Sequence, residues 1–320
     1  MSEPTPGERT VPTELGGRPL DAIVRALYGA TWGNARKWVA SGKVQVDGDT
    51  VLDYERRFRA GVTVVLAMSA PRRNRGARAE LEDSAIVHVD THVVVVNKPA
   101  GVSTIPFAEG ETGTLDELVR SWLSKRGKRG DRDTRPTLGV VHRLDKETSG
   151  VMVFTRTWLA KQSLTQQFRA HTTHRRYLAI AHGAVIARTI RSHLIPNRGD
   201  GLRGSLKSGG RSGGHEEGQL AITHVEPVEA LKGATLITCR LETGRTHQIR
   251  IHLSESGHPI VGERVYVRGY PGELILAPRL MLHAAELAFV HPATNVEVRF
   301  EREPPGDFEE TLGRLRPKRR

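Results

Sequence analysis

Residues 138–154 read Leu138-Gly-Val-Val-His-Arg-Leu-Asp-Lys-Glu-Thr-Ser-Gly-Val-Met-Val-Phe154. Both ends of this stretch are short apolar runs, which predicts two buried strands. The polar residues between the runs form a loop that contains Asp145. A loop held between rigid strands is a good support for a reactive group. Asp145 is therefore a candidate catalytic carboxylate, although an ion pair with Arg143 or Lys146 would explain it equally well.

Further apolar runs lie on both sides of this stretch. Strands are predicted at residues 86–89, 93–96, 138–141, 151–154, 176–181, 220–228, 234–241, 285–289 and 296–300. Helices are predicted near residues 114–124, 157–169 and 246–256, and the first of them begins with the capping box Thr114-Leu-Asp-Glu. Strands and helices follow each other without a regular alternation, which is typical of an α+β domain. We expect this domain to cover residues 84–315.

A smaller domain is predicted before it, at residues 18–68. Apolar residues at helical spacing indicate two short helices, followed by a strand from Val44 into an Asp-Gly turn and a closing strand at residues 61–66. Residues 1–17 contain three prolines and three glycines and are expected to form a flexible tail. Residues 69–83 have the composition of a linker. Residues 316–320 form a basic tail.

The charge balance points to a nucleic-acid partner. The chain of 320 residues has 48 Lys and Arg against 36 Asp and Glu, a formal net charge of +12, and such an excess is typical of surfaces that bind phosphate. An arginine-rich coding bias would produce the same count. Cys239 is the only cysteine, which excludes an intramolecular disulfide and a cysteine metal cluster. With no signal peptide and no apolar run of about 18 residues, we expect a soluble, cytoplasmic protein.

The run His142-Arg-Leu-Asp145, followed by Thr148-Ser-Gly, resembles the signature of RluA-type RNA pseudouridine synthases. The resemblance implies the fold of that family, with a mixed, mainly antiparallel sheet. It also implies that Asp145 attacks the target uridine, either at C1′ of the ribose or by removing the 2′ proton. The phrase Ser41-Gly-Lys-Val-Gln-Val-Asp-Gly48 resembles the RNA-binding domain named for ribosomal protein S-four.

Other family phrases imply further site residues. Residues 243–252 resemble the motif whose arginine, here Arg250, pairs with the catalytic carboxylate, and residues 175–180 resemble the segment that supplies the active-site Tyr177. Residues 97–102 and 280–284 match two more family phrases. The residues expected to contact substrate are Arg143, Lys98, His142, Arg245 and His283. Loop ordering in place of a phosphate contact is the alternative role for Lys98, and core packing is the alternative for His283. Those expected to face RNA phosphates in the small domain are Arg36, Lys37 and Lys43.

The partner implied by the resemblance is structured RNA, ribosomal or transfer, bound by a monomer. No cofactor is expected, because an ionised carboxylate performs either route alone. No metal is expected, because the pairs His171/His174 and His247/His252 lack a carboxylate that completes a ligand pattern. Two rival hypotheses are an RNA-binding protein without activity and a glycosidase that releases free uracil.

Overall fold

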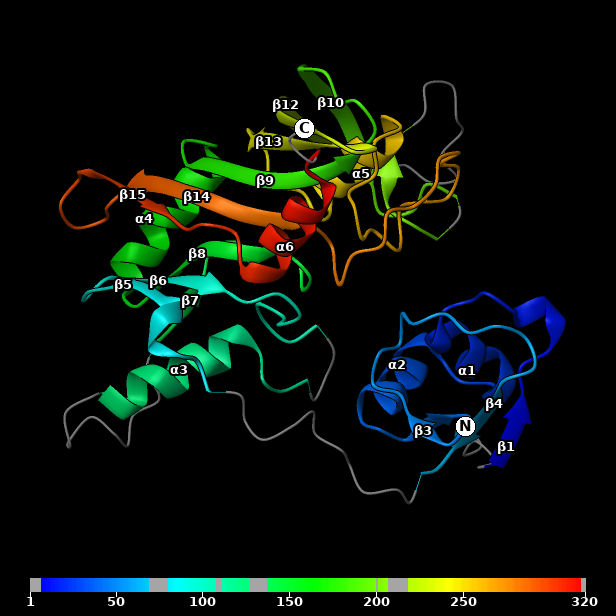
Figure 1. Ribbon diagram of the computed structural model, residues 1–320. Helices are drawn as coiled ribbons and strands as arrows, with labels where there is room; N and C mark the ends of the chain where they lie inside the picture. Colours follow the sequence, from blue (N-terminus) through cyan, green and yellow to red (C-terminus); the bar gives the residue numbers. More distant parts are fainter. Residues whose placement is uncertain are drawn as a thin grey trace. The chain divides into compact units, whose positions relative to one another are not determined.

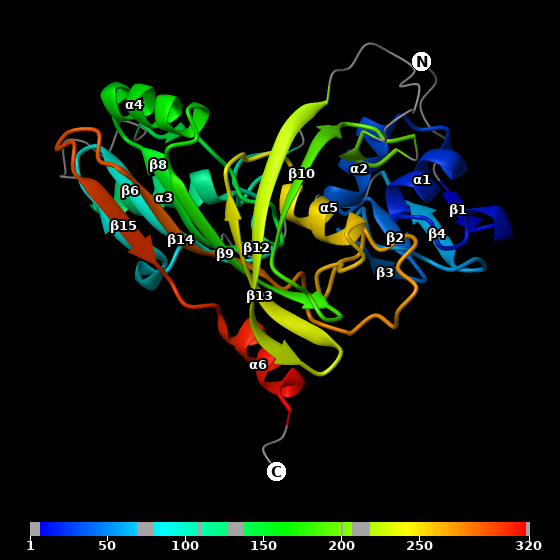
Figure 2. The ribbon, with the colours of Figure 1, turned by 90° about the horizontal axis from the view of Figure 1, so that it is seen from above.

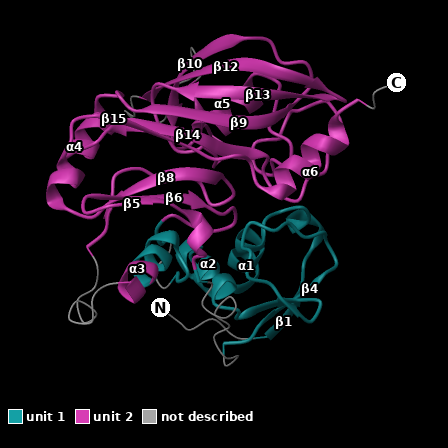
Figure 3. Ribbon diagram, turned by 60° about the vertical axis from the view of Figure 1, so that its left-hand side comes forward, with its two compact units in different colours: residues 1–80, 105–121 teal, residues 81–104, 122–320 magenta. Residues whose placement is uncertain are grey.

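The computed structural model describes residues 7–68, 80–107, 111–126, 137–199, 201–206 and 218–317. The chain divides into two compact units (Figure 3). The first unit contains residues 1–80 and 105–121, and the second contains residues 81–104 and 122–320. Residues 105–121, which were expected in the larger domain, thus cluster with the first unit. Most of the expected linker, residues 69–79, lies outside the described residues.

The first unit contains a four-stranded antiparallel sheet in the order β1-β4-β2-β3 (Figure 1). Its elements are β1 (Gly7–Thr10), α1 (Leu20–Tyr28), α2 (Trp32–Ala40), β2 (Val44–Val46), β3 (Asp49–Thr50) and β4 (Thr63–Leu66). Apolar side chains of both helices and of β2 and β4 form one buried core. The left-handed backbone of Gly29, with φ of 65°, ends α1.

The tail predicted for residues 1–17 is wrong over the part that the structure describes. Residues 7–10 form β1, which pairs with β4 along its whole length. The side chains of β1 are largely exposed, so the strand is held by backbone hydrogen bonds. Apolar patterning therefore gives no sign of it.

The second unit is built on an eleven-stranded sheet with the main order β11-β10-β12-β13-β9-β14-β8-β6-β5. β15 pairs with β14, and β7 pairs with β8. Among the strands that the structure describes, only β8 and β14 pair in parallel, so the expected mixed, mainly antiparallel sheet of an α+β fold is confirmed. The strands are β5 (Ile86–Val89), β6 (Val93–Lys98), β7 (Gly139–Val140), β8 (Ser149–Thr155), β9 (His174–His182), β10 (Arg188–Ile195), β11 (Gly204–Ser205), β12 (Gln219–Leu231), β13 (Ala234–Leu241), β14 (Leu282–Val290) and β15 (Glu297–Glu301).

Two helices cover different halves of this sheet (Figure 2). α4 (Trp158–Arg169) packs through Ala160 and Leu164 against valines of β6 and β8. α5 (Gln248–Glu255) packs through Ile251 against Leu194 and Ala221 of β10 and β12. Burial of each large aliphatic side chain contributes roughly 1.5–3 kcal/mol. The two small cores thus fix α4 and α5 on either side of the central strand β9.

The remaining helices are α3 (Leu115–Arg126) and α6 (Gly306–Leu315). The sequence analysis did not predict α6, β10 or β11. In β10 the first six residues alternate between half-buried and exposed positions, and only Leu194 and Ile195 at its end are buried, so the signal for a strand is weak. None of the described helices is long and apolar enough to span a membrane.

The glycine of the Thr-Ser-Gly run is Gly150 of β8, and the backbone of the neighbouring strand leaves no room for a side chain there. A Cβ at this position would lie 2.2 Å from the carbonyl oxygen of Ala284 in the parallel partner β14, and its φ is 119°. We expect Gly150→Ala to lower the free energy of unfolding by about 2 kcal/mol or more, because backbone atoms cannot yield. In Gly313→Ala, where α6 leaves open space, stability should rise by about 0.5 kcal/mol. Denaturant titration of both variants tests this; equal stabilities would contradict it.

Candidate functional site

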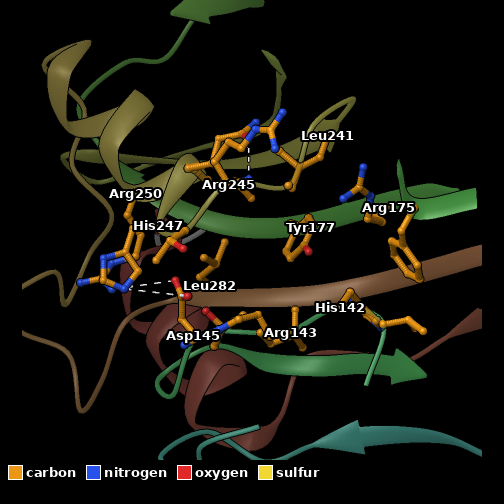
Figure 4. A pocket seen from close by; sticks show the side chains of 18 of the residues that line it. His142, Arg143, Asp145, Arg175, Tyr177, Leu241, Arg245, His247, Arg250 and Leu282 are labelled. Carbon is orange, nitrogen blue, oxygen red and sulfur yellow. Dashed lines mark hydrogen bonds and ion pairs between the residues drawn. The ribbon is translucent and has the colours of Figure 1, made fainter. Parts of the chain in front are cut away.

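A pocket of about 510 Å³ opens at the centre of the second unit, between α4 and α5. β9, β13 and β14 form its floor, and the loop that contains Asp145 forms one side (Figure 4). Asp145 is the only acid among the described residues that line it, whereas five arginines do so. The charged and aromatic lining residues are His142, Arg143, Asp145, Phe168, Arg169, His171, Arg175, Tyr177, Arg245, His247 and Arg250.

The backbone on both sides of Asp145 is held by buried side chains. Thr104 exchanges two hydrogen bonds with the backbone of Leu144, donating to its oxygen at 2.9 Å and accepting from its nitrogen at 3.3 Å. Lys98 donates to the oxygen of Lys146 at 3.0 Å. The residue before Asp145 and the residue after it are therefore anchored independently. This restricts the carboxylate to a narrow range of positions.

Lys98 is not among the described residues that line the pocket, which argues against the substrate contact expected for it. The side chain is fully buried, and its ammonium also donates to the carbonyl oxygens of Pro99 and Val102. Burial lowers the pKa of Lys98 to about 7, although the nearby charge of Asp145 acts in the opposite direction. Of the two roles predicted, loop ordering and phosphate contact, the structure supports the first.

Arg250 faces two carboxylates. Its Nε and Nη2 donate to Oε2 and Oε1 of Glu263 at 2.7 and 2.8 Å, while its Nη1 lies 3.9 Å from Oδ2 of Asp145. The bidentate partner is thus Glu263, and the contact with Asp145 is a longer ion pair. Burial would raise the pKa of Glu263, but the hydrogen bonds from Arg250 outweigh it and hold the pKa below the ordinary value.

His247 is the second neighbour of the catalytic candidate. Its Nε2 lies 3.8 Å from Oδ1 of Asp145, and its Nδ1 lies 2.8 Å from the hydroxyl of Tyr266. Burial lowers the pKa of His247 to about 4, so the ring is neutral at neutral pH. His247 is also the N-cap of α5 and has a φ of 58°, a strained conformation for a non-glycine residue. Strain of this kind is common where a fold aims a side chain at a site.

Tyr177 of β9 lies on the pocket floor between Asp145 and Arg175 (Figure 4). Burial raises the pKa of its hydroxyl, which is therefore protonated at neutral pH. A protonated phenol can donate a hydrogen bond, and its ring can stack on a base. These properties make the ring a platform and the hydroxyl a donor.

Two residues that were expected to contact substrate make hydrogen bonds within the protein instead. His142 lines the pocket, but its Nε2 accepts from the backbone nitrogen of Val153 at 3.1 Å and its ring stacks on Phe168. His283 is wrong as a pocket residue: it is fully buried and bonds to Ser149 and to the oxygen of Arg302. Its neighbour Leu282 faces the pocket instead, since successive residues of a strand point to opposite faces.

Arg143 and Arg245 do line the pocket, as expected. Arg143 is exposed beside Asp145 (Figure 4). The Nε of Arg245 donates to the backbone oxygen of Leu220 at 3.0 Å, which holds its guanidinium group at the pocket edge.

Comparison with known proteins agrees with this geometry. Residues 92–255 match the family model described as RNA pseudouridylate synthase. The chain belongs to the RNA pseudouridylate synthase family. It is accordingly a pseudouridine synthase, an intramolecular isomerase that modifies RNA, and this excludes both rival hypotheses.

Similar proteins span almost the whole chain. Ribosomal large subunit pseudouridine synthase D of Xanthomonas campestris pv. campestris is 33% identical over 97% of this chain and 92% of its own length. An uncharacterized RNA pseudouridine synthase of Bacillus subtilis is 32% identical over 91% of each chain. The solved structure of human RNA pseudouridylate synthase domain containing 1 shares the fold, with a TM-score of 0.57 and 24% identity over 75% of this chain and 90% of that one.

The residues of the first unit that were expected to face phosphates differ in their exposure and in the contacts that they make within the protein. Arg36 donates to Asp21 at 2.8 Å and lies over the rings of Trp32 and Tyr54. Lys43 donates to the oxygen of Met68 at 2.8 Å. Lys37 is exposed. Arg36 is thus held in the structure of the unit, and Lys37 best fits the expected role.

Sequence reasoning missed Thr104, Glu263 and Tyr266 and considered His247 only as a metal ligand. Glu263 lies 13 residues beyond Arg250 in a loop, and no local pattern links the two. The phrase that contains Thr104 directly follows the family motif at residues 97–102, so proximity was the only available signal. No group of three or more His, Cys, Asp or Glu side chains within the described ranges is arranged to hold a metal ion.

Replacement of Arg250 tests the buried pair in the RNA pseudouridylate synthase site. Arg250→Met leaves the carboxylate of Glu263, 5% exposed, without its partner and should lower the free energy of unfolding by about 3–5 kcal/mol at pH 7. Adding Glu263→Met should restore most of this loss. In the single variant the pKa of Glu263 rises above the ordinary value of 4.5, so its loss of stability should shrink as the pH falls through this raised pKa toward 4.5. Below 4.5 the gap should narrow further, because the wild type then loses the stability that its lowered pKa contributes. Additive losses in the double variant, measured by denaturant titration, would contradict the pairing.

Proposed function

We propose that this protein converts uridines of large-subunit ribosomal RNA to pseudouridine, with Asp145 as the catalytic carboxylate. The observation that carries the catalytic assignment is that Asp145 is the only acid among the described lining residues of a pocket rich in arginine. The substrate class rests on relatives named ribosomal large subunit pseudouridine synthase D, among them one from Pseudomonas aeruginosa that is 32% identical over all of this chain.

The pocket requires the target uridine to leave its RNA helix. Extrusion of a base from a stack requires a few kcal/mol, which contacts with phosphates and stacking on Tyr177 offset. Exposed Arg143 lies beside Asp145 at the pocket edge. It is positioned to occupy the space that the uridine leaves in the stack.

Two routes are open to Asp145, and both conserve all atoms of the substrate. In the first, a carboxylate oxygen bonds to C1′ as the bond from C1′ to N1 breaks. In the second, the carboxylate removes the 2′ proton and a glycal forms as the same bond breaks. The detached uracil then rotates and C5 bonds to C1′; in the first route the bond from the carboxylate to C1′ breaks at this step, and in the second the carboxyl group returns its proton to C2′. The C5 proton is then lost and N1 gains a proton. Arg250 and neutral His247 hold the carboxylate in place in either route.

The first unit supplies RNA affinity in this proposal, as an S-four-like domain would. Lys37 is exposed on α2, and Trp32 of the same helix lies beneath the guanidinium groups of Arg25 and Arg36. Each phosphate contact adds roughly −0.7 to −0.9 to the slope of log K against log salt. A Lys37→Gln variant whose RNA affinity falls with salt as steeply as that of the wild type would contradict the role of Lys37.

Asp145→Asn tests the catalytic assignment. We expect this variant to bind RNA with nearly wild-type affinity but to form no pseudouridine, because the amide oxygen is a poor nucleophile and a poor base. Single-turnover assays on large-subunit ribosomal RNA measure the rate, and Arg240→Gln, on the outer face of β13, provides the control. Substantial turnover by the Asn variant would remove Asp145 from the mechanism.

The wild type and Asp145→Asn also test the substrate class in cells. Deletion of the gene should remove pseudouridines from large-subunit ribosomal RNA, and they should return with the wild type but not with Asp145→Asn. Loss of pseudouridines from transfer RNA alone would contradict the ribosomal assignment.

A further inference from the structure

Two arginines of the pocket lining, Arg175 and Arg245, lie close enough for the charge of one to act on the other. Arg175 belongs to β9 and Arg245 precedes α5; together they are called the arginine cluster here. Figure 4 shows Tyr177 between Asp145 and Arg175, with Arg245 above them. Residues far apart in the sequence are therefore brought together in one pocket.

The protein supplies no carboxylate to this cluster from the described lining of the pocket. Arg175 donates to the backbone oxygen of Glu242 at 2.8 Å, and Arg245 donates to that of Leu220 at 3.0 Å. The Glu242 carboxylate itself contacts His224 at 2.6 Å. Neutral carbonyl groups satisfy hydrogen bonds but do not cancel charge. The local excess of positive charge is thus left for a ligand to neutralise.

Arg175 is the more deeply buried member of the cluster. Its side chain is 7% exposed and lies over the ring of Phe168, and its buried Nε has no hydrogen-bond partner among the described residues. A Cβ at Gly244 would lie 2.6 Å from Nη1 of Arg175, so the glycine provides the space for this guanidinium. The half-buried Arg245 adds a like charge that acts on Arg175, which is unfavourable by itself, so a bound anion would stabilise the arrangement.

The titration of neighbouring groups agrees with a positive local field. Burial lowers the pKa of Arg175, and the charge of Arg245 acts in the same direction. Burial also lowers the pKa of His171 at the pocket edge; both arginines act in the same direction, and the charge of Glu242 acts against them. The Asp145 end is different, because there Arg250 is balanced by Glu263.

We propose that the arginine cluster binds a phosphodiester group of the RNA strand next to the target uridine. The inference rests on the proposed function and identifies a second subsite within the same pocket. A volume of about 510 Å³ falls in the usual range for pockets that hold a small ligand, and it leaves room for a nucleotide with its phosphate. Uracil carbonyl groups are neutral and would leave the cluster uncompensated, whereas a phosphate accepts paired hydrogen bonds from guanidinium groups.

The test combines a change in the protein with a change in the RNA. Substrate RNAs carry a single uncharged methylphosphonate at one linkage near a uridine that the wild type is first shown to modify. We expect one linkage at which this change reduces the second-order single-turnover rate roughly ten- to hundredfold, as for a charge-assisted hydrogen bond. Arg245→Gln should show a similar loss with unmodified RNA. Combining the variant with that methylphosphonate should add little.

Matched variants separate this subsite from a general effect of charge. Arg240→Gln removes the same charge from β13, where Arg240 is exposed and its neighbour Leu241 lines the pocket; it should keep the full sensitivity to methylphosphonate. Arg175→Lys keeps the charge and avoids a larger change that could impair folding at this buried position. This variant should show a smaller rate difference between unmodified RNA and methylphosphonate RNA than the wild type.

Two results would overturn the subsite. One is a wild-type rate that is indifferent to methylphosphonate at every linkage near the target. The other is a set of losses for Arg245→Gln and methylphosphonate that multiply at all linkages, since independent effects mean no direct contact. Because wild-type turnover on unmodified RNA is established first, either result counts against the subsite and not against the proposed function.

Discussion

The bidentate hydrogen bond between Arg250 and Glu263 is the interaction on which the geometry of the site depends. Glu263 also accepts from the backbone nitrogens of Arg264 and Val265 at 2.9 and 2.8 Å, so it fixes the loop that leads to Tyr266. Tyr266 in turn contacts His247. Both groups beside Asp145 are therefore positioned from one buried carboxylate, and the charge of Arg250 is balanced before any substrate arrives. Placement of this kind limits reorganisation during a reaction.

The fold assembles this arrangement from two halves of one sheet. The valines of β6 and β8 hold α4, and the apolar residues of β10 and β12 hold α5. Asp145 belongs to the first half, through the anchors Lys98 and Thr104, whereas Arg250 belongs to the second. The distance of 3.9 Å between their side chains is thus set by packing across β9 and β14 rather than by a strong direct bond. A cavity in either core should disturb the alignment of the site.

Much of the fold was accessible from the sequence, because buried β-branched runs such as residues 93–96 and 151–154 indicate strands directly. The family motif placed Asp145, Tyr177 and Arg250 in one pocket. Individual roles were harder to predict, since burial decides them: Lys98 binds only backbone oxygens, and His283 points away from the pocket. Glu263 could not be predicted because an isolated glutamate in a loop carries no pattern. β1 was missed because its four residues, Gly-Glu-Arg-Thr, include no apolar side chain and are mostly exposed.

The most direct test of this account is the single-turnover rate of Glu263→Gln. The amide keeps the size of the side chain but removes its charge and one acceptor of the bidentate pair, so Arg250 and His247 should lose their alignment with Asp145. The account predicts a rate of pseudouridine formation lowered roughly ten- to hundredfold, with unchanged RNA affinity and partial recovery in Glu263→Asp. A Gln variant that folds and reacts at the wild-type rate would contradict the claim that Glu263 positions the catalytic site.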